Sequence, residues 1–199
     1  MRVFPRILLW VSLAAVSALP ASAAETTILI IRHGEKPAPG LGQLSCQGLN
    51  RALALPRVLL SRYGKPTAIY APNPALGKED LGVFYAYLRP LATVEPLAIQ
   101  AGLPVDVTWG FRDIQPLADR LLAAPEGLQV VAWEHHLGEQ LARNLLTQLK
   151  RDPGEVPAWA SADYDSIYVI RIVRTAEAAA RASFTRERQG LDGLPASCP

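Results

Sequence analysis

The chain has 199 residues, of which 50% are hydrophobic and 19% are charged, so it can bury one full hydrophobic core but not two of ordinary size. Its formal net charge of +2 falls to 0 when Arg2 and Arg6 are set aside, because 18 basic and 18 acidic residues then remain. This balance, with no basic stripe along the chain, excludes a typical nucleic-acid-binding protein. No segment after residue 24 is long and apolar enough to predict a membrane span.

Residues 1–24 have the pattern of a secretory signal peptide. The two arginines precede the apolar run ILLWVSLAAVSALP, and the small residues ASAA close the segment. A membrane anchor is the alternative, but the run is short for a span and Pro20 ends it. We therefore expect cleavage near Ala23 or Ala24 and a mature domain of residues 25–199. The protein would be periplasmic or secreted, with no membrane attachment after cleavage.

Two cysteines, Cys46 and Cys198, are present. An even count in an exported protein indicates a disulfide, with two free thiols as the alternative. The bridge would join the C-terminus to the first loop across 152 positions (198 − 46). In the chain-entropy model a loop of that size stabilises the fold by at most about 5 kcal/mol.

The predicted elements alternate between strands and helices. The first strand, residues 26–31, is apolar on both faces, which is typical of a buried strand in a parallel sheet. The first helix, residues 47–63, contains Pro56 and ends before Gly64. Further strands are expected at residues 67–71, 105–108, 128–133 and 165–173, and further helices at residues 91–101, 114–124 and 137–150.

Three segments are not assigned to a helix or a strand. Residues 76–86 have no clear period, and the alanine-rich segment RTAEAAARAS is compatible with a helix or an extended chain. The tail from Gly190 is expected to be irregular. The alternation elsewhere predicts one domain, a three-layer α/β/α sandwich with a mostly parallel central sheet. Ligands of such sheets bind beyond the carboxyl ends of the strands.

Two of the three histidines follow apolar strands directly. His33 ends the segment ILIIRH, and His135 ends VVAWEH. Because neighbouring parallel strands end at the same edge of a sheet, both rings are expected to face one cleft. A zinc site is the alternative use of three histidines. We expect no metal, because adjacent His135 and His136 diverge in most backbone conformations and Arg32 would repel a cation.

Arg32, beside His33, favours an anion as the ligand. A guanidinium group offers a rigid fork of donors that matches the oxygens of a phosphate. A neutral imidazole beside that fork can attack the bound phosphorus if a backbone carbonyl holds the other ring nitrogen. The pair therefore indicates phosphoryl chemistry.

The segment RHGEKP resembles the signature of the histidine phosphatase superfamily and its phosphoglycerate-mutase-like fold. The resemblance covers residues 26–150 in order and spacing. It implies that His33 becomes transiently phosphorylated and that Arg32 holds the phosphate. The segment RPLATVEPLA implies Arg89 as the second arginine, and VVAWEH implies His135 as the second histidine. The arrangement looks like an exported bacterial branch of this family.

The resemblance leaves the proton donor open. Asp113 and Glu134 are the two leading candidates, whereas Glu35 is expected to orient its neighbours. Lys36 and His136 are further candidates for the pocket. Residues 74–88 form a longer insertion before Arg89 than the family commonly has, and they contain Lys78 as an alternative second cation.

The resemblance implies an exported histidine acid phosphatase-type enzyme that hydrolyses a small phosphomonoester through phospho-His33. Arg32 and Arg89 would clamp the phosphate, and His135 would stabilise the group in transfer. No metal or other cofactor is expected. A phospho-ligand-binding module without turnover, a phosphomutase and a zinc hydrolase are the alternatives. The sequence predicts no oligomeric state.

Overall fold

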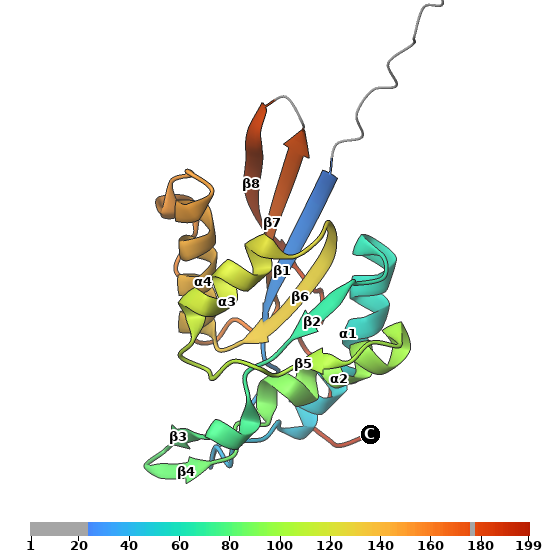
Figure 1. Ribbon diagram of the computed structural model, residues 1–199. Coiled ribbons are helices and arrows are strands. Elements are labelled where there is room, and N and C mark those ends of the chain that lie inside the picture. The colour runs from blue at the N-terminus through green and yellow to red at the C-terminus, as the bar shows by residue number, and fades with distance from the viewer. Residues whose placement is uncertain (1–23, 176–177) are drawn as a thin grey trace, which may run out of the picture.

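The computed structural model describes residues 24–175 and 178–199 (Figure 1). The expected signal peptide lies outside the described residues except for Ala24, which begins the first strand. Among the described residues, no helix has the length and apolar character needed to cross a membrane.

A central six-stranded sheet runs in the order β5-β2-β6-β1-β7-β8. Its strands are β1 (Ala24–Arg32), β2 (Ala68–Tyr70), β5 (Val105–Asp106), β6 (Gly127–Trp133), β7 (Ser166–Thr175) and β8 (Ala178–Arg188). The pairs of β1 with β6, β6 with β2 and β2 with β5 are parallel, and β7 and β8 add an antiparallel hairpin. The sheet is therefore mostly parallel, as predicted.

Helices cover both faces of the sheet, which gives the predicted three layers (Figure 1). They are α1 (Cys46–Tyr63), α2 (Arg89–Ala101), α3 (Ile114–Ala123) and α4 (His135–Gln148). The side chains of β1 point alternately to the two faces of the sheet. Ile28 and Ile30 pack with α3 and α4, whereas Leu29 and Ile31 pack with α1 and α2. All four are fully buried, and each such side chain contributes about 1.5–3 kcal/mol.

Two of the three segments for which the sequence predicted neither a helix nor a strand contain strands. The alanine-rich segment continues into β8, which pairs with β7 from Ser166↔Arg188 to Thr175↔Ala178. Residues 74–88 form a short 3₁₀ helix (Pro74–Leu76) and a separate hairpin of β3 (Lys78–Asp80) and β4 (Val83–Tyr85). This hairpin projects beyond the carboxyl ends of β2 and β6 (Figure 1).

A disulfide joins Cys46 to Cys198, as the sequence analysis expected, with Cα atoms 4.5 Å apart. Cys46 is the first residue of α1, and Ser45 caps that helix by accepting a hydrogen bond from the Gly48 backbone N–H. The bridge therefore anchors the C-terminal tail beside the loop that leaves β1.

Candidate active site

A cavity of about 270 Å³ lies beyond the carboxyl ends of β1 and β6. It is lined by Arg32, His33, Lys36, Lys78, Glu79, Asp80, Arg89, Glu134, His135, Ser161 and Tyr164. A hollow of about 310 Å³ at the amino ends of the same strands contains none of the predicted site residues. We therefore treat the first cavity as the candidate active site.

His33 extends the parallel pairing of β1 with β6, because its backbone N–H donates to the Trp133 carbonyl at 2.9 Å. The ring is 3% exposed, and its Nδ1 lies 2.8 Å from the Gly34 carbonyl oxygen. A carbonyl can only accept, so Nδ1 carries the proton and the Nε2 lone pair is left available. Burial, with the charges of Arg89 and Arg32, lowers the pKa of His33 to about 3, so the ring is neutral near pH 7.

Gly34 ties this loop to α1 and α2. Its N–H donates to Thr93 Oγ1 at 2.9 Å, and Thr93 Oγ1 donates to the Arg89 carbonyl at 2.8 Å. A Cβ at position 34 would lie 2.9 Å from the Gly48 carbonyl oxygen, so any side chain there would push the loop away from α1. The glycine in the RHGE segment is therefore needed for this close backbone packing.

The two arginines approach the cavity from different elements. Arg32, at the end of β1, lies 3.7 Å above the Tyr164 ring, and its Nη1 donates to the Ser161 carbonyl at 2.5 Å. Arg89, at the start of α2, donates from Nη1 to Asp80 Oδ2 at 2.6 Å. Both side chains are almost completely buried. Each guanidinium is thus held in place by part of its donor set.

His135 is the first residue of α4, and Glu134 before it caps the helix. The Glu134 carboxylate accepts hydrogen bonds from the backbone N–H groups of His136 and Leu137, both at 3.1 Å. His135 Nδ1 lies 2.8 Å from Glu134 Oε1, within ion-pair distance, whereas Nε2 has no hydrogen-bond partner in the part of the chain that the structure describes. The ring is thus placed beside the cavity by the helix start.

Several buried polar atoms around the cavity have no hydrogen-bond partner among the described residues. They are Arg32 Nε, Arg89 Nε and His135 Nε2. Leaving a buried polar group unpaired costs about 1–3 kcal/mol, so such groups are rare in stable proteins. Because these residues line the same cavity as His33, they indicate a site built to receive a polar ligand.

Comparisons with solved structures give related folds at low sequence identity. A structure described as mycobacterial hydrolase 2 matches at 17% identity with a TM-score of 0.55, over 81% of this chain and 89% of that one. A protein assigned as phosphohistidine phosphatase SixA from Nakamurella multipartitia matches at 15% identity with a TM-score of 0.52, over 85% and 98%. The chain has the histidine phosphatase fold.

A mycobacterial glucosyl-3-phosphoglycerate phosphatase, solved with inorganic phosphate, shares this fold at 19% identity with a TM-score of 0.51, over 82% of this chain and 96% of that one. No protein-family model matches the sequence, and no curated protein matches it. At these identities the likeness establishes the histidine phosphatase fold and not the reaction.

Within this histidine phosphatase fold, six of the predicted site residues line the cavity. They are Arg32, His33, Lys36, Arg89, Glu134 and His135. Three others do not. Asp113 is exposed and accepts a hydrogen bond from the Gly110 N–H at 2.9 Å, and His136 is exposed on α4. Glu35 turns toward α1.

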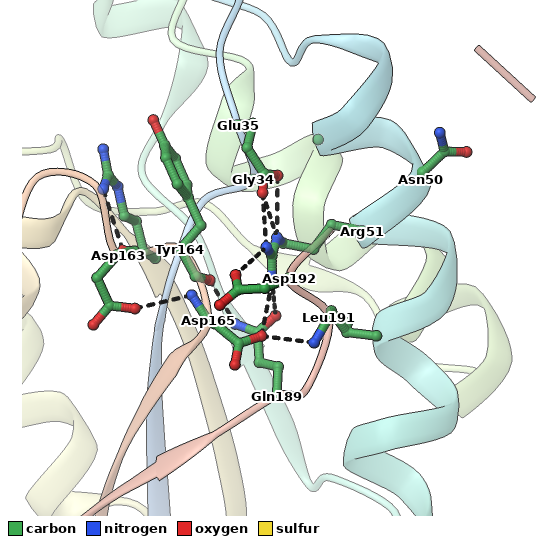
Figure 2. Close-up of polar contacts among 12 residues, drawn as sticks. Gly34, Glu35, Asn50, Arg51, Asp163, Tyr164, Asp165, Gln189, Leu191 and Asp192 are labelled. Atoms are coloured by element: carbon green, nitrogen blue, oxygen red, sulfur yellow. Dashed lines mark hydrogen bonds and ion pairs between the residues drawn. The ribbon is translucent and has the colours of Figure 1, made fainter. Parts of the chain in front are cut away.

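Glu35 belongs to a second buried charge site, centred on Arg51 (Figure 2). Arg51 donates to Glu35 Oε1 at 2.7 Å, to Asp165 Oδ1 at 3.2 Å and to Gln189 Oε1 at 3.0 Å. Asp192, from the C-terminal tail, accepts a further bond at 3.2 Å. The loop after His33 is thus held by α1, β7 and the tail together, which agrees with the expected orienting role of Glu35.

Sequence reasoning missed several residues of the cavity. Asp80 accepts hydrogen bonds from both Lys36 and Arg89 and so links the β3–β4 hairpin to the loop after His33 and to α2. Tyr164 and Ser161, from the loop before β7, hold Arg32. Lys78, the alternative second cation, lines the cavity as Arg89 does.

The expectation that the rings of His135 and His136 diverge is wrong. Their centroids are 4.0 Å apart, and ligand atoms of Glu134, His135 and His136 lie within 4.8 Å of one another. Both residues lie in the first turn of α4, which Glu134 caps. The Glu134 oxygens already accept two backbone hydrogen bonds, which favours a capping role over cation binding.

Proposed function

We propose that this protein is an exported phosphatase that hydrolyses a small phosphomonoester through a phosphohistidine at His33, without a metal ion. The observation that carries the proposal is the set of unpaired buried donors from Arg32, Arg89 and His135 beside a neutral imidazole whose Nε2 is available. No step requires a Lewis acid in this scheme, because the side chains themselves supply the positive charge.

In the first step the phosphoryl oxygens accept hydrogen bonds from Arg32, Arg89 and His135. The Nε2 lone pair of His33 attacks phosphorus, the P–O ester bond breaks, and its electrons go to the leaving oxygen. The Gly34 carbonyl keeps the Nδ1 proton in place and stabilises the positive charge that develops on the ring. The arginines neutralise the charge spread over the equatorial oxygens.

In the second step water attacks the phosphohistidine, the P–N bond breaks, and its electrons return to Nε2. The products are the alcohol and inorganic phosphate. Of the two leading candidates for the proton donor, only Glu134 lines the cavity. The phosphatases named among the structural neighbours support phosphoester chemistry for this fold, although they do not identify the substrate.

The test is release of inorganic phosphate from p-nitrophenyl phosphate, with and without a chelator, by the wild type and His33→Ala. We expect turnover that the chelator leaves unchanged and that falls by about 10⁴-fold or more in the variant, because the nucleophile is lost. Lys65→Met, at an exposed position outside the cavity, is the control and should retain full activity. If phosphate binds but a broad panel of esters is not turned over, the protein is a binding module.

The proposal of export is supported by the pattern of residues 1–24. Fractionation of cells producing the full chain should recover a shortened protein outside the cytoplasm, with its N-terminus near Ala24 or Glu25. Full-length protein in the cytoplasmic fraction would contradict it.

A further inference from the structure

Two of the three carboxylates that line the cavity are poorly suited to protonate a leaving oxygen, because their surroundings keep them ionised. Burial alone would raise the pKa of Asp80, but hydrogen bonds from Lys36 and Arg89 lower it below its ordinary value. Burial likewise opposes ionisation of Glu134, yet contact with His135 and two backbone N–H groups lowers its pKa to about 2. Glu79 is exposed at the rim. Two of the three are therefore ionised near neutral pH.

Lys78 presents a donor on the same cavity wall. It is half-buried, and β3 brings it there from the hairpin inserted between β2 and α2. Its Nζ lies 5.1 Å from the centroid of the Tyr87 ring and 5.3 Å from that of Phe111. Among the described residues, no carboxylate lies within ion-pair distance of it, unlike Lys36 and Arg89, which both contact Asp80.

The Tyr87 ring connects Lys78 to the nucleophile. Tyr87 packs edge-on against His33, with ring centroids 6.0 Å apart, and the Arg89 guanidinium lies 5.1 Å from the same Tyr87 centroid. Lys78 thus shares one aromatic wall with a phosphate-binding arginine and the nucleophilic histidine. Its ammonium group therefore belongs to the same cavity as His33 and Arg89.

The charges around Lys78 act in both directions. Burial lowers its pKa below the ordinary value for lysine, Glu134 and Asp80 oppose this, and Arg89 and Lys36 add to it. A lysine in such surroundings gives up its proton more readily than an exposed one.

We propose that Lys78 is the catalytic proton donor to the leaving oxygen, a role that rests on the phosphohistidine route above. As the P–O bond breaks, the leaving oxygen takes a proton from Lys78 Nζ, and the alcohol departs from a neutral amine. In the second step the amine takes a proton from the attacking water as the P–N bond breaks. The ammonium group is thereby restored, and the sum is an ester and water converted to an alcohol and phosphate.

The experiment compares kcat/KM for p-nitrophenyl phosphate, whose leaving group needs no proton, with that for glycerol phosphate, whose alkoxide does. Because kcat/KM covers only the steps through phosphoryl transfer, it isolates the role in the first step. In Lys78→Met we expect a loss of about 10²–10⁴-fold for glycerol phosphate and less than about tenfold for p-nitrophenyl phosphate. Lys78→Arg should show the same pattern, because arginine keeps the charge but does not release its proton.

The controls separate this role from rival explanations. If Lys78→Met lowers kcat/KM equally for both esters and Lys78→Arg restores it, the proposal is overturned. Lys78 would then contribute only its positive charge. A leaving-group-dependent loss in Glu79→Gln but not in Lys78→Met would assign the proton to Glu79 instead. Circular dichroism confirms that each variant is folded. A wild type that turns over neither ester would instead reject the phosphatase proposal itself.

Discussion

Two buried arginine sites lie near the loop that carries His33, and they differ in how many of their hydrogen-bond donors have an acceptor within the protein. The Arg51 guanidinium donates from all three of its nitrogens, to Glu35, Asp165, Gln189 and Asp192 (Figure 2). Arg32 and Arg89, in the cavity, each keep a buried Nε without an acceptor among residues 24–175 and 178–199.

The difference shows how one residue type serves stability in one place and binding in another. At Arg51 the donors are matched by carboxylates and an amide of the same chain, so the charge is neutralised within the fold. At the cavity the fold fixes each guanidinium by one edge only and leaves the rest for a ligand. Substitutions in the two sites should therefore have opposite consequences for stability and activity.

The largest effect on stability is expected for Arg51→Met. It removes the central cation of a buried cluster, so that Glu35 loses its ion-pair partner and Asp165 keeps only Arg188, and the free energy of unfolding should fall by about 3–5 kcal/mol. Urea denaturation measures this, with Arg57→Met, an exposed position on the same helix, as the control. A loss no greater than that of the control would show that Arg51 is not a structural anchor.

The opposite pattern, a large loss of activity with a small loss of stability, is expected for Arg32→Met. Its kcat/KM for p-nitrophenyl phosphate should fall by about 10²–10³-fold, because one donor to the transition state is lost. Its free energy of unfolding should change much less than that of Arg51→Met, since Arg32 bonds only to backbone carbonyls and stacks on Tyr164. Steady-state kinetics and urea denaturation on one preparation test both halves, and unchanged activity per folded molecule would refute the phosphate-binding role.

A smaller effect is expected when the disulfide is removed by Cys198→Ser. The bridge anchors the tail that contributes Gln189 and Asp192 to the Arg51 site, and its loss should cost about 2–4 kcal/mol of unfolding free energy. Activity per folded molecule should remain. Reduction of the wild-type protein should lower its free energy of unfolding by the same amount. Identical stability of the oxidised and reduced forms would show that the disulfide does not stabilise the fold by holding the tail.

The smallest expected effect is the dependence of the free energy of unfolding on pH. The pKa of His33 is about 3 in the folded protein against an ordinary 6.5, so below pH 6.5 the unfolded chain binds a proton that the folded protein does not. Stability should therefore fall as the pH drops from 6.5 toward 3, by about 2 kcal/mol at pH 5. The stability of His33→Gln should fall less over this window. Parallel pH dependences of the two proteins would contradict the neutral, desolvated ring.

Much of the fold follows from the sequence because the buried strands are continuous apolar runs and two of the helices, α1 and α2, end at glycine. The β1 and β6 runs are apolar on both faces since each face meets a helix layer. The β8 strand is different, because alanine favours a helix, and only its pairing along β7 makes the segment extended. Such long-range pairing leaves no local signal.

The β3–β4 hairpin was missed for a local reason. Its turn residues, Leu81 and Gly82, have φ of 53° and 79°, and asparagine or aspartate is usual where leucine stands here. In the site, the RHGE and VVAWEH segments located the central residues, because both follow adjacent strands. Their partners come from distant segments, Asp80 from the end of β3 and Tyr164 from the loop before β7, and nothing in their local sequence indicates that contact.

The central claim is a covalent phosphohistidine at Nε2 of His33, and acid-free quenching during turnover tests it most directly. Wild-type protein mixed with p-nitrophenyl phosphate and denatured at alkaline pH should carry one acid-labile phosphoryl group, which mass spectrometry places on the peptide containing His33. His33→Ala should carry none. A phosphoryl group on another residue would contradict the account. So would phosphate release at full rate with an unmodified His33 and undiminished activity in the variant.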